Sequence, residues 1–267
     1  MTRYFIHMAY DGTSYHGWQV QPNGTTVQQV LENALSTLLQ TGISVTGAGR
    51  TDTGVHASCF YAHFDLPEKL PPGPSRIRHT ATDTNSPHHP DFVFRLNRFL
   101  PPDIVVYRIW ETDSKFHARF SALYREYEYR ISRIKPLFDR NYSLYHYGSL
   151  DLDEIGKCCR IILETRDFTS FSKLHTDVKT NICTVSHVEW RAHDDGYLFL
   201  IRADRFLRNM VRSLTGTMME VGKGKLTSRE FQGIVDAKDR KMAGQSVPAH
   251  GLFLTGIGYP GEVEPGQ

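Results

Sequence analysis

One short glycine-rich segment carries the residues best suited to chemistry. Residues 47–57 read Gly-Ala-Gly-Arg-Thr-Asp-Thr-Gly-Val-His-Ala, which places a guanidinium, Arg50, two positions from a carboxylate, Asp52. Glycines this dense favour a backbone that turns sharply or lets a ligand approach closely. An ionised carboxylate at such a tip can act as a nucleophile or stabilise an electron-poor centre. The plainer interpretation is a tight turn with Arg50 in solvent, and composition alone favours neither.

A second candidate cluster is the aromatic and basic stretch Arg125-Glu126-Tyr127-Glu128-Tyr129-Arg130. Strand alternation places Tyr127 and Tyr129 on one face, together with Arg125. Aromatic rings on an open strand face offer a π surface on which a planar ring of a ligand can stack. Ordinary aromatic core residues on a half-buried strand are the simpler interpretation of the same pattern.

A third cluster is a row of arginines in a segment predicted to be helical from about Asp204 to Val221. Arg205, Arg208 and Arg212 fall along one stripe, and apolar residues fall on the opposite side. Such a stripe is usually a solvated face, but it could also contact phosphates.

The elements that must position these residues follow from periodicity and capping signals. Strands are predicted at Arg3–Tyr10, Ser44–Ala48, Ser58–Asp65, Tyr124–Ile134, Thr184–Arg191 and Tyr197–Ala203. Capping boxes formed by Thr26 with Gln29 and by Thr227 with Glu230 predict two helices, the second ending near Ala237. A further helix begins at Asp151, with Leu152, Ile155, Cys159, Ile162 and Leu163 directed inward.

This order of elements predicts an α+β fold with a mostly antiparallel sheet and flanking helices. Two pseudo-related subdomains sharing the sheet would meet at a central catalytic cleft. We expect an N-terminal subdomain at 1–110, a C-terminal subdomain at 111–260 and a tail at 261–267, with a surface loop at 66–91. The adjacent His88 and His89 in that loop are more simply solvated residues than metal ligands.

Composition sets limits on function. The chain has 267 residues and a mean hydropathy of -0.40. Its net charge is only +2, so affinity for nucleic acid must come from local clusters of Arg and Lys. No apolar run approaches the ~20 residues of a membrane span, and no signal peptide is evident. Four cysteines without a CxxC pair indicate reduced thiols in a cytoplasmic protein. No cluster has metal-ligand or nucleotide-binding spacing, so neither a metal nor a cofactor is expected.

The glycine-rich segment resembles the signature of the tRNA pseudouridine synthase TruA family. Further blocks match that family in order along nearly the whole chain. They are Tyr10-Asp11-Gly12-Thr13, Gly17-Trp18-Gln19, Thr26-Val27-Gln28, Leu96-Asn97, Leu100-Pro101, Phe116-His117-Ala118-Arg119, Arg125 with Tyr127 and Tyr129, Asp167-Phe168, Phe206-Leu207, Met210-Val211-Arg212, Val221-Gly222 and Ala249 to Leu252. The chain departs from the family at Ser58-Cys59-Phe60-Tyr61 and in a longer loop from Pro71 to Asp91.

The resemblance implies a homodimer that acts on tRNA, with no role at membranes or on DNA. Uridines at positions 38, 39 and 40 of the anticodon stem–loop would become pseudouridine, with Asp52 as the essential carboxylate. By the same resemblance Tyr127 is the active-site tyrosine, and Arg50 and Arg212 lie beside the carboxylate. Arg205 and Arg208 are then expected to contact RNA phosphates. Whether Asp52 attacks the sugar, attacks the base or abstracts a sugar proton stays open.

Two rival functions use the same residues. An RNA-binding module could keep the fold without catalysis, but Arg50, Asp52 and Tyr127 are all present. A nucleoside or glycoside hydrolase would need a second carboxyl group to activate water, and the segment offers only one Asp. Isomerisation therefore fits better than either.

Overall fold

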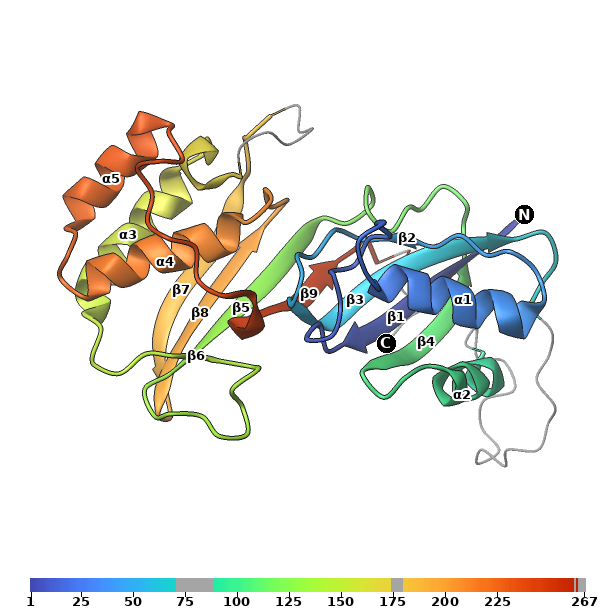
Figure 1. Ribbon diagram of the computed structural model, residues 1–267. Coiled ribbons are helices and arrows are strands. Elements are labelled where there is room, and N and C mark those ends of the chain that lie inside the picture. Colours follow the sequence, from blue (N-terminus) through green and yellow to red (C-terminus); the bar gives the residue numbers. More distant parts are fainter. Residues whose placement is uncertain (71–88, 174–179, 262, 264–267) are drawn as a thin grey trace. The chain divides into compact units, whose positions relative to one another are not determined.

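The computed structural model describes residues 1–70, 89–173, 180–261 and 263, so most of the expected surface loop lies outside the described residues (Figure 1). The chain forms two compact units. Unit 1 comprises Met1–Leu123 and Gly256–Gln267, and unit 2 comprises Tyr124–Thr255. The α+β class and the mostly antiparallel strand pairing predicted from the sequence are confirmed.

Unit 1 is built on a strand that is buried on both of its faces. Its elements are β1 (Thr2–Tyr10), α1 (Val27–Leu39), β2 (Thr46–Gly47), β3 (His56–Leu66), α2 (Pro90–Phe99) and β4 (Ile104–Thr112). Strand β1 pairs antiparallel with β3 on one side and with β4 on the other. Its consecutive residues Phe5 and Ile6 are both fully buried, as expected for a central strand.

The pairing register of β1 shows which residues lie at each end of the strands of unit 1. Tyr10, at the end of β1, pairs with Ala57, the last residue of the glycine-rich segment. Arg3, at the start of β1, pairs with Asp65 and Thr112. Residues 48–55 of the glycine-rich segment therefore form a loop between β2 and β3 at the Tyr10 end of these strands.

In unit 2, helices pack beside a further set of mostly antiparallel strands (Figure 1). Its elements are β5 (Tyr124–Ser132), β6 (Leu144–Tyr145), α3 (Leu152–Glu164), a 3₁₀ turn at Thr169–Phe171, β7 (Val185–His193), β8 (Gly196–Ala203), α4 (Met210–Gly222), α5 (Ser228–Ala237) and a second 3₁₀ turn at Ala249–Gly251. Strand β8 lies between β5 and β7, antiparallel to both, and β6 pairs parallel with β5. Strand β9 (Leu252–Gly258) carries the chain from unit 2 back to unit 1.

Helix capping follows the sequence closely at one helix and partly at another. The Thr227 side chain accepts from the Glu230 N–H and the Glu230 carboxylate accepts from the Thr227 N–H, which is a complete capping box. At α1, Thr26 accepts from the Gln29 N–H, which is the first half of the predicted box. Among the described residues, no helix has the length and apolar character needed to cross a bilayer.

Two helix predictions are wrong in detail. Helix α4 begins at Met210 rather than near Asp204, because Asn209 adopts the left-handed conformation (φ 66°), which a right-handed helix cannot include. Arg205 and Arg208 therefore lie in the preceding turn, and only Arg212 is helical. In α3, Cys158 is buried, while Leu163, expected to face inward, is 39% exposed.

Candidate active site

The Asp52 loop (residues 48–55) is a tight turn whose backbone is held by unit 1. The Val55 N–H donates to the Asp52 carbonyl at 3.1 Å and closes the turn, and Gly54 has a φ of 76°. The Gly54 N–H also donates to the Tyr15 carbonyl at 3.3 Å. The turn expected from composition is thus present, with Asp52 at its start.

Gly12 and Gly17 allow the segment that carries them to pack closely against this loop. A Cβ at Gly12 would lie 2.0 Å from the Val55 carbonyl oxygen, and one at Gly17 would lie 2.3 Å from that of Thr51. Gly17 also has a φ of 84°, which side chains disfavour. The segment carrying both glycines therefore contacts the loop on either side of Asp52. The sequence alone gives no structural role for these glycines, which appear there only within blocks that match the family, because their contacts with the loop are long-range.

Exposure divides the side chains around the loop into buried and exposed ones. Thr51, Val55 and His56 are buried, whereas Arg50 is exposed and Asp52 is partly exposed. The His56 Nδ1 accepts the Gly12 N–H at 3.1 Å, so this imidazole is used to fix the Asp11–Gly12 turn. No group of three or more potential metal ligands occurs among the described residues. The loop therefore leaves Arg50 and Asp52 accessible, while Thr51 and Val55 hold it against unit 1.

In unit 2, Tyr127 and Tyr129 occupy alternate positions of β5, opposite Ile201 and Phe199 of β8. The Tyr127 ring is partly exposed and meets the Phe206 ring edge-on, with 5.1 Å between ring centroids. Phe206 lies in the segment before α4, outside the helix expected from about Asp204, where its ring limits the orientation of Tyr127.

Tyr129 is fully buried, and its hydroxyl donates to the Pro248 carbonyl at 2.9 Å. Burial raises the pKa of this phenol, and the positive charge of Arg212 acts against that rise. A Cβ at Gly251 would lie 2.8 Å from the Tyr129 ring, so glycine is needed there. Residues 247–251 thus brace the tyrosine beneath Tyr127.

The three arginines have different settings. The Arg212 Nε donates to the Val247 carbonyl at 2.7 Å, and the Arg212 carbonyl accepts the Val247 N–H at 3.2 Å. Arg208 is exposed, while Arg205 is partly buried, and its N–H donates to the Asp204 carboxylate at 2.7 Å. Arg212 is therefore fixed to the segment that also braces Tyr129.

The predicted site residues fall into two groups. Arg50 and Asp52 belong to unit 1, and Tyr127, Arg205, Arg208 and Arg212 belong to unit 2. Within unit 2, Tyr127 neighbours Phe206, and Arg212 is close enough to Tyr129 to influence its pKa. The pairing of Arg212 with Asp52, and the cleft between the units, stay predictions.

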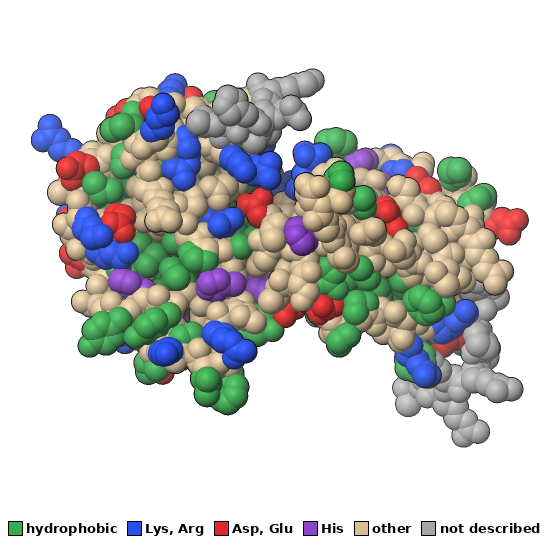
Figure 2. Space-filling view, in the orientation of Figure 1, with side chains coloured by type: hydrophobic (Ala, Val, Ile, Leu, Met, Phe, Trp, Pro, Cys, Tyr) green, Lys and Arg blue, Asp and Glu red, His purple; other side chains and the backbone are tan. Residues whose placement is uncertain are grey.

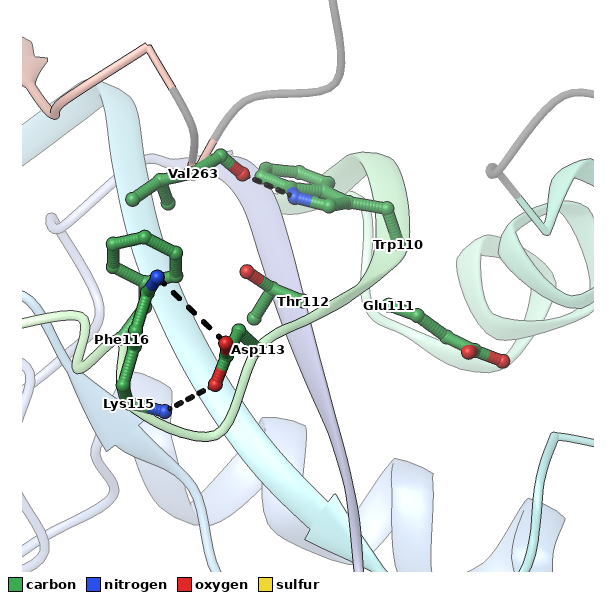
Figure 3. Close-up of a pocket in the computed structure, with 7 residues that line it drawn as sticks. All are labelled: Trp110, Glu111, Thr112, Asp113, Lys115, Phe116 and Val263. Atoms are coloured by element: carbon green, nitrogen blue, oxygen red, sulfur yellow. Dashed lines mark hydrogen bonds and ion pairs between the residues drawn. The ribbon is translucent and has the colours of Figure 1, made fainter.

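A separate pocket of about 330 Å³ lies in unit 1 (Figure 3). Trp110, Phe116 and Val263 are among its lining residues, and the Trp110 indole N–H donates to the Val263 carbonyl at 2.8 Å. The pocket also contains Thr112, which pairs with Arg3 at the start of β1, whereas the Asp52 loop lies at the opposite end of that strand. This pocket is therefore distinct from the candidate active site.

Comparison with known proteins supplies the deciding observation. The sequence profile of the tRNA pseudouridine synthase family matches residues 6–81 and 163–260. The chain belongs to this family. The tRNA pseudouridine synthase A of Bacteroides thetaiotaomicron is 50% identical, with 98% of this chain and 93% of the relative covered.

More distant relatives match over almost the same length. The tRNA pseudouridine synthase A of Parabacteroides distasonis is 47% identical with 99% of both chains covered, and that of Bacillus subtilis is 36% identical with 94% and 97% covered. The resemblance seen in the sequence is confirmed, and with it an isomerase family that acts on tRNA. Arg50, Asp52 and the three arginines lie inside the matched segments, while Tyr127 lies between them.

Proposed function

We propose that the chain converts uridine to pseudouridine at positions 38, 39 and 40 of the tRNA anticodon stem–loop, with Asp52 as the catalytic carboxylate. The observation that carries the proposal is the construction of the Asp52 loop. Buried anchors hold its backbone, and one carboxylate and one guanidinium are presented at its exposed side. The loop also lies within a segment that matches the family profile.

The chemistry needs an anion beside the ribose. The bond between N1 of uracil and C1′ breaks, the base rotates, and C5 bonds to C1′ while the C5 proton is lost and N1 gains a proton. Because C1′ becomes electron-poor as the first bond breaks, the Asp52 carboxylate can stabilise or capture it. No external reactant is consumed, so the reaction needs no second activated molecule.

Hydrolysis would need a second carboxylate free to activate water, and two nearby candidates, Asp11 and Asp103, are already hydrogen-bonded to the segment 13–15 behind the loop. The Asp11 Oδ1 accepts both the N–H and the hydroxyl of Thr13, and the Asp103 Oδ1 accepts the Tyr15 hydroxyl at 2.6 Å. These carboxylates are committed to turns and packing rather than to activating water. The geometry therefore supports a single-carboxylate reaction.

RNA recognition is assigned to side chains of both units. Tyr127 offers a ring on which the flipped uracil can stack. The exposed guanidiniums of Arg50 and Arg208 suit phosphates, and we assign Arg205 to the same role. Arg212 is proposed to hold the Asp52 carboxylate ionised and oriented.

A direct test uses an unmodified transcript of a tRNA that has uridine at positions 38, 39 and 40. After incubation, pseudouridine is mapped along the transcript by carbodiimide labelling and primer extension, and free uracil is measured by chromatography. We expect pseudouridine only at these positions, with no uracil released. Free uracil would identify a hydrolase, and binding without modification would identify an RNA-binding module.

We further propose a homodimer, supported by an apolar surface beside β6. Five large side chains between residues 134 and 147 are exposed, with Phe138 84% and Tyr147 82% exposed. The five are Ile134, Leu137, Phe138, Tyr145 and Tyr147. Figure 2 shows hydrophobic side chains gathered over this part of unit 2. With about 150–250 Å² for each fully exposed ring, the set approaches the ~800 Å² that each partner buries in a stable interface.

Sedimentation at several concentrations tests this surface. Phe138→Glu should convert a dimer to a monomer, because it places a charge in the apolar interface. Phe94→Glu is the matched control, since Phe94 is an exposed phenylalanine on α2 of unit 1. A dimer that survives Phe138→Glu would show that the copies meet elsewhere.

A further inference from the structure

The residue immediately before Asp52 is held by a buried hydrogen bond between two side chains. The Tyr10 and Thr51 hydroxyls are 2.9 Å apart, and these residues are only 4% and 9% exposed. The backbone bonds nearby are longer, at 3.4 Å from the Trp18 N–H to the Thr51 carbonyl and 3.3 Å from the Gly54 N–H to the Tyr15 carbonyl. The side-chain bond is therefore the shortest of these contacts around Asp52.

The Tyr10 hydroxyl is itself fixed by the sheet. Tyr10 is the last residue of β1 and pairs with Ala57 of β3, so its backbone belongs to the central strand of unit 1. Its ring meets Phe60 edge-on, with 5.5 Å between ring centroids, and lies 6.1 Å from the Trp18 ring. Few rotamers are open to a ring packed in this way. The hydroxyl thus links a rigid strand directly to the loop.

The Asp52 backbone is constrained on both of its sides by such contacts. Its own carbonyl closes the turn to Val55, and the Gly17 backbone lies against the Thr51 carbonyl. Without the Tyr10 hydroxyl, the Thr51 side chain would lose this bond and could rotate, while the Thr51 carbonyl would keep the long bond from the Trp18 N–H. A displacement of a catalytic group by about 1 Å can cost 10²-fold in rate, so small freedom at residue 51 matters.

We infer that Tyr10 is a positioning residue, which acts through the Thr51 hydroxyl to hold Asp52 in its reactive position. This inference rests on the proposed function of Asp52. Neither Tyr10 nor Thr51 is assigned a contact with RNA, since both are buried. Their loss should therefore lower the rate of the chemical step and leave tRNA affinity largely unchanged.

The test is a double-mutant cycle on single-turnover rates at saturating tRNA. Tyr10→Phe and Thr51→Val each remove one hydroxyl and should each lower the rate about tenfold, with KM changed less than about twofold. The double variant should be no slower than either single variant, because both remove the same bond. Thr51→Ser keeps the hydroxyl and should restore most of the rate. Additive losses, or no loss, would overturn the inference.

A matched control separates positioning from general destabilisation. Tyr4 is also a buried tyrosine of β1, and its hydroxyl accepts the Leu70 N–H at 3.0 Å, but it lies toward the other end of the strand. Tyr4→Phe should lower the midpoint of thermal unfolding about as much as Tyr10→Phe while leaving the rate unchanged. An equal rate loss in Tyr4→Phe would mean that the effect is only structural.

The same assays with wild type and Asp52→Asn keep the two proposals apart. If wild type forms pseudouridine and Asp52→Asn does not, the proposed function stands whatever Tyr10→Phe does. If Tyr10→Phe then matches wild type, only the positioning role is rejected.

Discussion

Asp52 lies between buried and exposed neighbours: Thr51 is buried, whereas Arg50 and Thr53 are exposed. The exposed pair Arg50 and Asp52 could be recognised from residue type and spacing. The buried anchors could not, because the Tyr10–Thr51 bond joins residues 41 positions apart and the Gly12–His56 bond joins residues 44 apart. Such contacts depend on strand register, which is a long-range property.

A buried histidine far from the loop gives a prediction for stability against pH. The His63 Nδ1 accepts the Ala118 N–H at 3.1 Å, and burial with the nearby charge of Arg3 lowers the pKa of His63 to about 4. In the unfolded chain this pKa is about 6.5. Between these values the unfolded state binds a proton that the folded state excludes, so stability falls as the pH falls through this window.

The matching variant is His63→Asn, whose side-chain oxygen can also accept the Ala118 N–H. From pH 7 to pH 4.5, wild type should lose about 2 to 3 kcal/mol more of its free energy of unfolding than the variant. Urea unfolding at several pH values measures the difference. Asp65, whose pKa is lowered chiefly by its hydrogen bond to Arg3, is common to both proteins. Parallel stability curves for the two proteins would contradict the assignment.

At the scale of elements, local signals predicted what local forces determine. The capping box at Thr227 and the helix that ends at Ala237 are confirmed, because a cap depends on residues three positions apart. The predicted start of α4 was wrong. The apolar spacing begins before Met210, but Asn209 adopts the left-handed conformation, so the helix cannot begin before it. The short helix α2 was missed, since it begins at Pro90, right after a stretch rich in proline and histidine.

The corrected position of the arginines sharpens a prediction. Arg208→Ala and Arg205→Ala should each weaken tRNA binding and reduce the slope of log K against log[salt] by about 0.7 to 0.9, if each contacts one phosphate. Affinity at several salt concentrations measures this. Arg229→Ala is the control, since Arg229 is an exposed arginine of α5 in the same unit. If Arg205→Ala and Arg208→Ala match the control, the RNA docks elsewhere.

Arg212 should behave differently because it is assigned to the carboxylate. Arg212→Ala is expected to depress the single-turnover rate at saturating tRNA and to change the salt slope little. Arg212→Lys keeps the charge but loses the guanidinium fork that also bonds Val247, so it should restore the rate only in part. An effect on affinity alone would rule out the carboxylate role.

At the scale of the whole molecule, the α+β class could be predicted from the sequence, but the return of the C-terminal segment to unit 1 could not. The C-terminal segment Gly256–Gln267 belongs to unit 1, although residues 124–255 separate it from the rest of that unit. The Trp110 indole, buried in unit 1, donates to the carbonyl of Val263 near the C-terminus. No local pattern reports such a pairing across 153 residues.

The catalytic scheme also makes a whole-molecule prediction about metals. The proposed reaction needs only the Asp52 carboxylate and its neighbours, so activity should survive exhaustive EDTA treatment. The assay must use tRNA folded before the metal is removed, because Mg²⁺ can fold the RNA independently of the enzyme. Loss of activity that Zn²⁺ restores would contradict this scheme.

The most direct measurement is the release of tritium from tRNA labelled at C5 of uridine, in a single turnover with Asp52→Asn beside wild type. Isomerisation replaces the C5 hydrogen by the bond to C1′, so each event releases one label to water. Asparagine keeps the size of the side chain but cannot supply the anionic oxygen. We expect wild type to release the label and Asp52→Asn to release none above background, with tRNA affinity and unfolding midpoint close to wild type. Release by Asp52→Asn within about tenfold of wild type would contradict the central role of this carboxylate.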